Sequence, residues 1–301
     1  MRPAQVYAAI QKQARARGRA SDELLTLYGL ERFLARLSAT RHANDFVLKG
    51  GVLLAAYSVR RPTRDIDVQA LDFPVDEAHL RAVVEAVSAV VTDDALVLEP
   101  AGVTVEQIRD AAEYSGLRVT VPAKVSRFTF ALKLDVSTGD PIYPAPETIE
   151  LPSILDSDHP VRMLGHPMPM VVAEKTVTML QRGTTSTRWR DLVDVCALAR
   201  AYAFSAVDLG VAIAVVAEHR QVTVRSLAPG LAGYGASSQA KWAAWLRAQG
   251  MADRASADLD DQVADVLAFV DPVFAGEAGQ SWQWDPDARR WSDTFGPARR
   301  P

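Results

Sequence analysis

The chain has 301 residues, of which 49% are hydrophobic and 23% are charged, with a formal net charge of −4. This length allows one large domain or two smaller ones, and the composition is that of an ordinary globular protein. A single cysteine, Cys196, excludes an internal disulfide framework and suits a reducing compartment, and no apolar run is long enough to span a bilayer. The start of the chain has no signal-peptide core, so we expect a cytoplasmic protein without membrane association.

The first residues combine helical patterning with local positive charge. Residues 3–18 and 21–37 each predict a helix, the second with a leucine-rich apolar stripe. A phosphate backbone can bind such a basic patch even on an acidic protein, but a solvated helix surface explains the patch equally well. The basic residues, with no acid among residues 1–19, are Arg2, Lys12, Arg15, Arg17 and Arg19.

A motif within residues 46–68 organises the next part of the chain. It predicts an apolar strand, a turn at Gly50-Gly51, a helix directly after the turn, and a second strand that carries Asp65 and Asp67. The two glycines allow the backbone to approach a ligand closely, and a helix N-terminus behind them favours anions.

The two aspartates indicate a cation site. Residues two apart on a strand point to the same side, so Asp65 and Asp67 project together. Their charges repel unless a cation lies between them, and Mg²⁺ is the usual one. A phosphate cradle beside two carboxylates is what nucleotide-dependent phosphoryl or nucleotidyl transfer requires.

A crossover helix and two strands follow. Residues 76–91 predict the helix, and residues 117–125 and 127–136 predict adjacent strands in a mixed sheet. Asp135 lies near the end of the second strand, where an isolated aspartate is usually a turn residue. Its interpretation therefore depends on the carboxylate pair upstream.

The proline-rich residues 141–169 predict an irregular connection with one short strand, Thr148–Leu151. We expect this connection to separate residues 1–145 from a mainly helical half, residues 146–301. Further helices are predicted over residues 170–182, 188–202, 207–219, 241–249 and 259–270.

Two of these helices carry charged residues in a suggestive pattern. Lys175 lies on the first, and Asp191 and Asp194 lie on one face of the second, because residues three apart are neighbours on a helix. A solvated helix surface and an ordinary pair within one helix are the plainer interpretations of each residue alone. The tryptophans of this half could stack on bases, but helix packing explains them more simply.

In combination, these motifs resemble the nucleotidyltransferase fold of the DNA polymerase β superfamily. The resemblance rests on Lys49-Gly50-Gly51, followed fourteen residues after Gly51 by Asp65-Ile66-Asp67. Within the superfamily, the segment before Asp67 and the later Arg-Asp-Leu-Val-Asp of residues 190–194 resemble the AbiEii/AbiGii toxins, a group that includes the mycobacterial MenT toxins. The resemblance covers about residues 30–205, and each of its motifs would be a weak signal alone.

The resemblance implies an α+β (mixed α/β) fold, with a polymerase-β-like core around a mixed sheet and a helical C-terminal half that completes the active site. It implies a site for two Mg²⁺ ions at Asp65, Asp67 and Asp135. It implies that the NTP is bound by Lys49, Gly50, Gly51, Arg64 and Lys175. Lys175 and Asp191 are also expected to act in catalysis, and Asp194 is the alternative to Asp191. Many superfamily members have Gly-Ser where this chain has Gly50-Gly51, so a serine contact to phosphate is absent.

The resemblance also implies a biological role. Such toxins transfer a nucleoside monophosphate from an NTP to the 3′ end of tRNA, which blocks aminoacylation and translation, and a cognate antitoxin restrains them. Arg60, Arg61 and the basic N-terminal helix are where we expect the acceptor stem to dock. Thr63 occupies a place that is phosphorylated in some silenced relatives. Two alternatives stay open: nucleotidyl transfer to a small molecule or a protein side chain, and a catalytically silent binding module.

Overall fold

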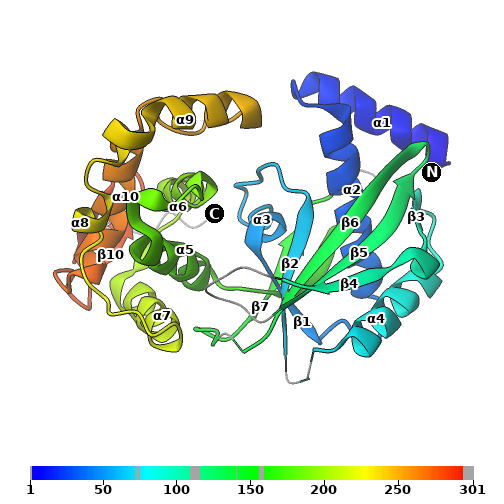
Figure 1. Cartoon of the computed structure of the whole chain (residues 1–301), viewed down its shortest axis with the longest axis horizontal. Coiled ribbons are helices and arrows are strands. Elements are labelled where there is room, and N and C mark those ends of the chain that lie inside the picture. Colours follow the sequence, from blue (N-terminus) through cyan, green and yellow to red (C-terminus); the bar gives the residue numbers. More distant parts are fainter. Residues whose placement is uncertain are drawn as a thin grey trace. The chain divides into compact units, whose positions relative to one another are not determined.

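The computed structural model describes residues 2–71, 73, 75–108, 116–139, 141–155 and 159–293. The chain divides into two compact units (Figure 1). The first comprises Met1–Asp140 and Pro146–His166, and the second comprises Pro141–Ala145 and Pro167–Pro301. The stretch Pro146–His166, which the sequence assigned to the helical half, lies in the first unit because its alternating apolar residues complete the sheet there.

The first unit is built on a mixed sheet, as the sequence predicted, and the sheet has eight strands. Seven strands follow the order β3-β5-β6-β2-β1-β8-β7, and β4 pairs with β5. The pairs β2–β6 and β1–β8 are parallel and the others antiparallel. The strands are β1 Phe46–Lys49, β2 Asp65–Ala70, β3 Leu96–Leu98, β4 Thr104–Gln107, β5 Gly116–Val125, β6 Phe128–Ser137, β7 Glu147–Leu151 and β8 Val161–Gly165.

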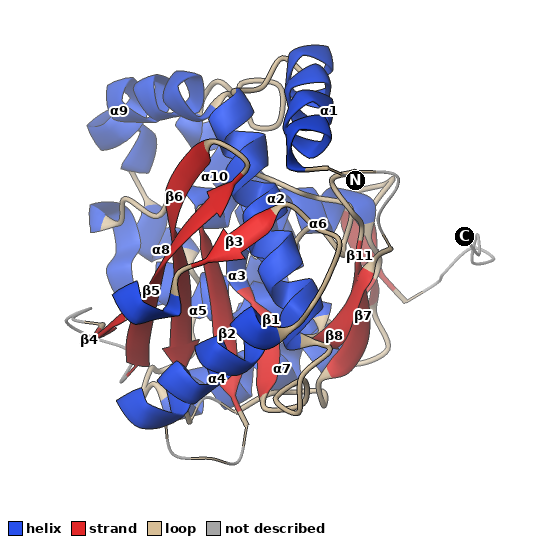
Figure 2. Ribbon diagram, turned by 90° about the vertical axis from the view of Figure 1, so that its right-hand side faces the viewer, coloured by secondary structure: helices blue, strands red, loops and turns tan. Residues whose placement is uncertain are grey.

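Helix α2 supplies much of the core of the first unit. It contacts β3, β5, β6 and β8, and α4 packs against it in turn (Figure 2). The leucine-rich stripe predicted from the sequence is buried along this contact. At Gly29 the helix comes so close to β6 that a Cβ atom would lie 2.3 Å from Cζ of Phe130. The helices are α1 Pro3–Ala16, α2 Ser21–Leu37, α3 Gly50–Leu53 and α4 Glu77–Ala89, with a 3-10 turn at Pro100–Gly102.

The β5–β6 hairpin fixes which residues face each other beside the centre of the sheet. Val125 pairs with Phe128, so only Ser126 and Arg127 form the turn, and Ser126 has a φ of 57°. A two-residue turn with a positive φ matches the twist of the two strands. The resulting register places each residue of β6 opposite a defined residue of β5.

The second unit is mainly helical, as predicted, with a small sheet of order β11-β10-β9. Trp242, Trp284 and Trp291 are buried, and the indole N–H of each donates to a backbone carbonyl. These three tryptophans therefore serve packing. The elements are α5 Met168–Arg182, α6 Trp189–Ala201, α7 Ala206–His219, α8 Ala228–Leu231, α9 Tyr234–Gln249, α10 Leu259–Phe274, β9 Phe204–Ser205, β10 Gln283–Asp285, β11 Arg290–Ser292 and a 3-10 turn at Gly183–Thr185.

Within the described residues, no helix combines the length and the apolar character that crossing a bilayer would require.

Candidate active site

Four charged residues form a row across four neighbouring strands of the first unit. Lys49 of β1 is paired with Asp67 of β2, and Asp67 is paired with Asp135 of β6. Arg118 of β5 lies opposite Asp135 at the other end of the row. Directly paired residues share a face of the sheet, so two carboxylates lie side by side between two cations.

Asp65 adds a third carboxylate to this face, because it lies two residues before Asp67 on β2. Burial, together with the charges of Asp65 and Asp135, raises the pKa of Asp67 to about 6, against the opposing charges of Lys49 and Arg61. Burial and the neighbouring carboxylates therefore disfavour the ionised form of Asp67, which a bound cation would stabilise. Three adjacent carboxylates fit a divalent cation of the Mg²⁺ type, which prefers oxygen ligands.

The two glycines at the end of β1 are required by the protein's own packing. Gly50 has a φ of 66°, and a Cβ atom there would lie 1.9 Å from Oδ2 of Asp67. A Cβ atom at Gly51 would lie 2.7 Å from Oγ1 of Thr63 and 2.9 Å from Nη1 of Arg61. The absence of a serine at residue 51 thus follows from the tight contact with the loop before β2.

Arg118 is a site residue that the sequence reasoning missed. Its Nε and Nη2 atoms donate to the two carboxylate oxygens of Asp135 at 2.7 and 2.6 Å, the two-pronged geometry that arginine forms with carboxylates. A signal was present in the sequence, since a two-residue turn at Ser126-Arg127 puts Arg118 opposite Asp135. The Arg118 side chain is 38% exposed, so it has room to leave the carboxylate.

We expect Arg118→Gln to tighten the binding of a divalent cation at the carboxylate cluster by roughly 10-fold. The guanidinium occupies both oxygens of Asp135 and repels an incoming cation, and glutamine removes both effects. Titration with Mn²⁺, followed calorimetrically, measures the change. Arg162→Gln, which removes an exposed arginine paired with Glu150, is the matched control. Unchanged or weaker binding in Arg118→Gln would show that the arginine does not compete with the cation.

The loop before β2 holds Thr63 and Arg64 in different surroundings. Thr63 is 5% exposed, and its hydroxyl donates to Oδ1 of Asp65 at 2.9 Å. Arg64 is exposed, whereas Arg61 is buried and donates to the Pro62 carbonyl at 3.0 Å. Arg60 lies 3.9 Å from the buried carboxylate of Glu31. Of the three arginines in this loop, Arg64 is exposed, Arg60 is partly exposed and Arg61 is buried.

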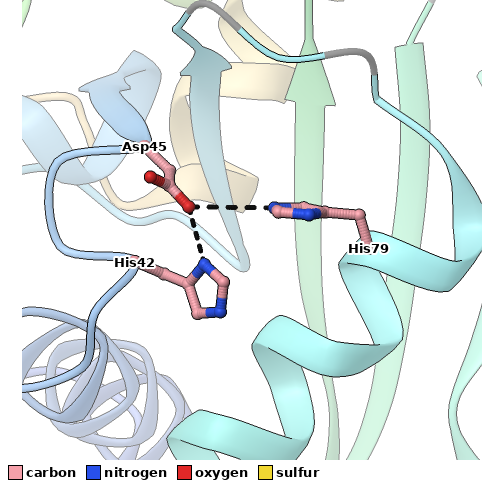
Figure 3. Close-up of side chains that lie close together, drawn as sticks. All are labelled: His42, Asp45 and His79. Carbon is pink, nitrogen blue, oxygen red and sulfur yellow. Dashed lines mark hydrogen bonds and ion pairs between the residues drawn. The ribbon is translucent and has the colours of Figure 1, made fainter.

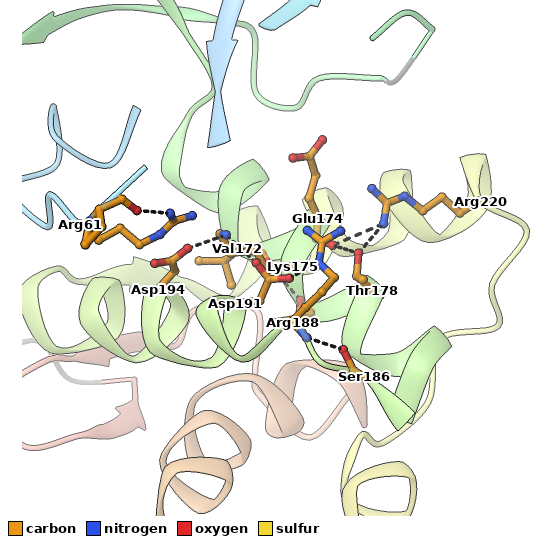
Figure 4. A network of polar contacts seen from close by, with 12 residues as sticks. Arg61, Val172, Glu174, Lys175, Thr178, Ser186, Arg188, Asp191, Asp194 and Arg220 are labelled. Atoms are coloured by element: carbon orange, nitrogen blue, oxygen red, sulfur yellow. Dashed lines mark hydrogen bonds and ion pairs between the residues drawn. The ribbon is translucent and has the colours of Figure 1, made fainter. Parts of the chain in front are cut away.

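Lys175, Asp191 and Asp194 meet in the second unit (Figure 4). All three are buried, and Nζ of Lys175 donates to Oδ1 of Asp191 and to Oδ2 of Asp194, each at 2.8 Å. Nε of Arg188 donates to the other oxygen of Asp191 at 2.6 Å. The structure therefore joins the lysine of α5 to both aspartates of α6, and both Asp191 and Asp194 contact Lys175 equally closely.

The ion pairs of Asp191 with Lys175 and Arg188 should make the folded protein less stable in acid. Burial alone would raise the pKa of Asp191, but the charges of Lys175 and Arg188 outweigh it and lower the pKa to about 2. A folded-state pKa below the unfolded value gives stability that is present above about pH 4 and lost as the pH falls towards 2. We expect Asp191→Asn to cost on the order of 2 kcal/mol at pH 6 and less at pH 3.

Urea unfolding of the wild type and Asp191→Asn at both pH values measures this dependence. Asp253→Asn, at an exposed position of the same unit, is the control and should differ little from the wild type at either pH. An Asp191→Asn cost that stays constant between the two pH values would contradict the assignment.

A model of the family of AbiEii nucleotidyl transferase toxins of type IV toxin–antitoxin systems matches residues 32–269. A search of curated proteins finds no significant match. Among solved structures, a Helicobacter pylori protein described as a nucleotidyltransferase is 16% identical, covers 81% of this chain and 92% of its own, and has a TM-score of 0.44.

Two further solved structures are similar to this chain. JHP933 from H. pylori is 17% identical, with 81% of this chain and 89% of that one covered and a TM-score of 0.45. The nucleotidyltransferase toxin MenT4 from Mycobacterium tuberculosis H37Rv is 16% identical, with 85% and 92% covered and a TM-score of 0.49.

Proposed function

The chain belongs to the AbiEii family of nucleotidyl transferase toxins of type IV toxin–antitoxin systems, and from that premise we propose that its acceptor is tRNA. In this proposal, the protein transfers a nucleoside monophosphate from an NTP to the tRNA 3′ end in a Mg²⁺-dependent reaction in the cytoplasm. The modified tRNA is no longer aminoacylated, so translation stops. The observation that carries the chemistry is the cluster of three carboxylates at the centre of the sheet beside the Gly50 turn.

Within this proposal, the residues of the first unit bind and orient the reactants. Asp65, Asp67 and Asp135 would hold two Mg²⁺ ions. When bound, these ions activate the acceptor hydroxyl and balance the charge that develops on the triphosphate. Asp135 could accept the proton of that hydroxyl once Arg118 has released its oxygens.

Other groups would bind the triphosphate. The backbone amides at Gly50-Gly51 suit a phosphate, and Lys49 and the exposed Arg64 add positive charge. In the second unit, ion pairs with Asp191 and Asp194 hold the ammonium of Lys175 in one position. Because both carboxylates compensate its charge, Lys175 would neutralise a leaving pyrophosphate once it has released one of them.

The acceptor stem is proposed to dock on helix α1. Lys12, Arg15 and Arg17 are exposed on or directly after this helix, and residues 1–19 contain no acidic residue. A basic helix face of this kind binds a phosphate backbone in a salt-dependent manner. With Arg61 buried and Arg60 beside Glu31, the docking is assigned to the exposed basic residues of α1 and to Arg64.

Regulation is assigned to the cognate antitoxin that the family implies, with Thr63 as a site of silencing phosphorylation. A phosphate on Oγ1 would carry up to two negative charges beside Asp65, where the hydroxyl now donates, and would repel a triphosphate. Because Thr63 is buried, the loop must open for a kinase to reach it. Intact-mass measurement after co-expression with the antitoxin tests this, and an inhibited protein with unmodified Thr63 would contradict it.

The acceptor is tested by incubating the protein with total tRNA, Mg²⁺ and each α-³²P-labelled NTP in turn. We expect label in tRNA from at least one NTP, and no label in tRNA whose 3′ terminal diol has been oxidised with periodate. Gln substitutions at Lys12, Arg15 and Arg17 should weaken tRNA binding and flatten its salt dependence. Label in a small molecule or in protein instead would replace tRNA as the acceptor, and no nucleotide or cation binding at all would indicate a silent module.

A further inference from the structure

We propose that His42, Asp45 and His79 form a second metal site, specific for a transition-metal dication such as Zn²⁺. Asp45 directly precedes β1, and its backbone pairs with Leu71 just beyond β2. The site therefore lies at the opposite end of β1 from Lys49 and the carboxylate cluster. Histidine spacing in the sequence did not reveal it, because His42 and His79 come from a loop and from the first turn of α4.

Three ligand atoms converge on one point between this loop and α4 (Figure 3). The ring nitrogens and the carboxylate oxygen all lie within 4.8 Å of one another. Oδ2 of Asp45 lies 2.6 Å from Nδ1 of His42 and 3.8 Å from Nε2 of His79. Two ligands on a tetrahedral zinc ion, each about 2.1 Å from it, are roughly 3.4 Å apart, so small side-chain shifts would suffice.

His79 provides an independent reason to expect a ligand. Its Nε2 atom is buried and has no hydrogen-bond partner, although it faces the carboxylate of Asp45 at 3.8 Å. A buried polar atom without a hydrogen bond costs free energy, and a coordinated metal ion would satisfy it. The imidazole is held in this orientation by Phe73, whose ring centroid is 4.4 Å away, and by an edge-to-face contact with His42 at 5.3 Å.

The ligand set defines the class of metal. Two imidazoles and one carboxylate suit zinc and its neighbours, whereas Mg²⁺ prefers oxygen alone. Three protein ligands leave the remaining coordination positions to water. This chemistry differs from that of the all-carboxylate cluster at the other end of β1, so the two sites should select different cations.

Binding requires one change in protonation that the structure allows. Nε of Arg41 donates to Nε2 of His42 at 3.2 Å, which puts the ring proton on Nδ1, facing Asp45. To bind a metal through Nδ1, the ring proton moves to Nε2 and the Arg41 contact breaks. Arg41 is exposed and can turn into solvent. The bound ion would then join the loop before β1 to the first turn of α4.

The test is equilibrium binding of Zn²⁺ and Co²⁺ to the full chain in the Asp67→Asn background, which weakens competition from the carboxylate cluster. We expect one ion per chain, a Co²⁺ absorption spectrum with nitrogen ligation, and a zinc-dependent rise in melting temperature. His79→Ala and Asp45→Asn should each weaken zinc binding by about 100-fold or more. Removing a group that only hydrogen-bonds a metal ligand already costs about 10- to 100-fold in affinity, and these two substitutions remove the ligands themselves.

His159→Ala, which removes an exposed histidine elsewhere in the unit, is the matched control and should bind zinc as the parent does. Melting of each metal-free variant shows whether it is folded, and His79→Gln replaces His79→Ala if the latter is not. No zinc binding by the folded parent would overturn the site. Binding that survives both His79 and Asp45 substitutions would do so as well.

Discussion

Replacing Asp67 with asparagine is expected to abolish nucleotidyl transfer while leaving the protein folded. Asp67 is the central carboxylate of the row, directly paired with both Lys49 and Asp135. A bound metal ion contributes several kcal/mol to such a reaction, so we expect a loss of about 1000-fold or more. The measurement is the rate of label transfer from the preferred NTP to tRNA, at saturating Mg²⁺.

The same substitution should stabilise the metal-free protein above neutral pH. The pKa of Asp67 is raised to about 6, so the folded state holds this proton more tightly than the unfolded chain does. Stability therefore rises as the pH falls from about 6 to about 4, and the cost of the charged form is fully present above pH 6. We expect Asp67→Asn to be more stable than the wild type at pH 8, on the order of 2 kcal/mol without metal.

These two results separate a catalytic role from a structural one. An inactive variant that melts at a higher temperature than the metal-free wild type at pH 8 matches the account. A variant with substantial transfer activity would remove Asp67 from the reaction. A variant that is inactive but unfolded would instead assign Asp67 a structural role.

Gly50→Ala should cause the second large loss. A Cβ atom at residue 50 would overlap Oδ2 of Asp67 at 1.9 Å, and the backbone there has a φ of 66°. Alanine in this conformation costs about 1 kcal/mol, and displacing the carboxylate costs more. Because misplacing a reacting group by about 1 Å can reduce a rate by about 100-fold, we expect at least that loss in transfer activity.

Gly18→Ala is a matched control for this prediction. Gly18 also has a positive φ, 60°, but a Cβ atom there has nothing within 4 Å. The Gly18→Ala variant should therefore lose only the stability that alanine costs at a positive φ, and it should retain full transfer activity. The comparison uses urea unfolding for stability and label transfer for activity. Equal activity in Gly50→Ala and Gly18→Ala would mean that the contact with Asp67 does not matter for the reaction.

Much of the first unit could be predicted from the sequence because its signals are local. The apolar stripe of α2, the Gly50-Gly51 turn and the alternation of β6 each follow from neighbouring residues, and the mixed sheet was confirmed. The expected helix after Gly51 is short, ending at Leu53. The family assignment was also reached from these motifs, and the match over residues 32–269 confirms it.

Features that depend on contacts distant in sequence were missed. The short strand expected within the proline-rich residues 141–169 is present as β7, but β8 was read as part of the irregular connection because it becomes a strand only by pairing with β1 and β7. Arg118 was overlooked because its meaning comes from the residue opposite it on β6. The His42–Asp45–His79 group lay outside any spacing rule, since α4 brings His79 to the loop.

The most direct test of the central claim is to count the cations that the three carboxylates bind. Mn²⁺ is titrated, with a non-transferable α,β-methylene NTP present, into three proteins that all carry His79→Ala and that have the wild-type carboxylate cluster, Asp135→Asn or Asp67→Asn. We predict two ions in the carboxylate cluster of the wild type, one in Asp135→Asn, and neither bound tightly in Asp67→Asn. A wild type that binds no Mn²⁺ with nucleotide, or an Asp67→Asn variant that binds as much as the wild type, would contradict the account.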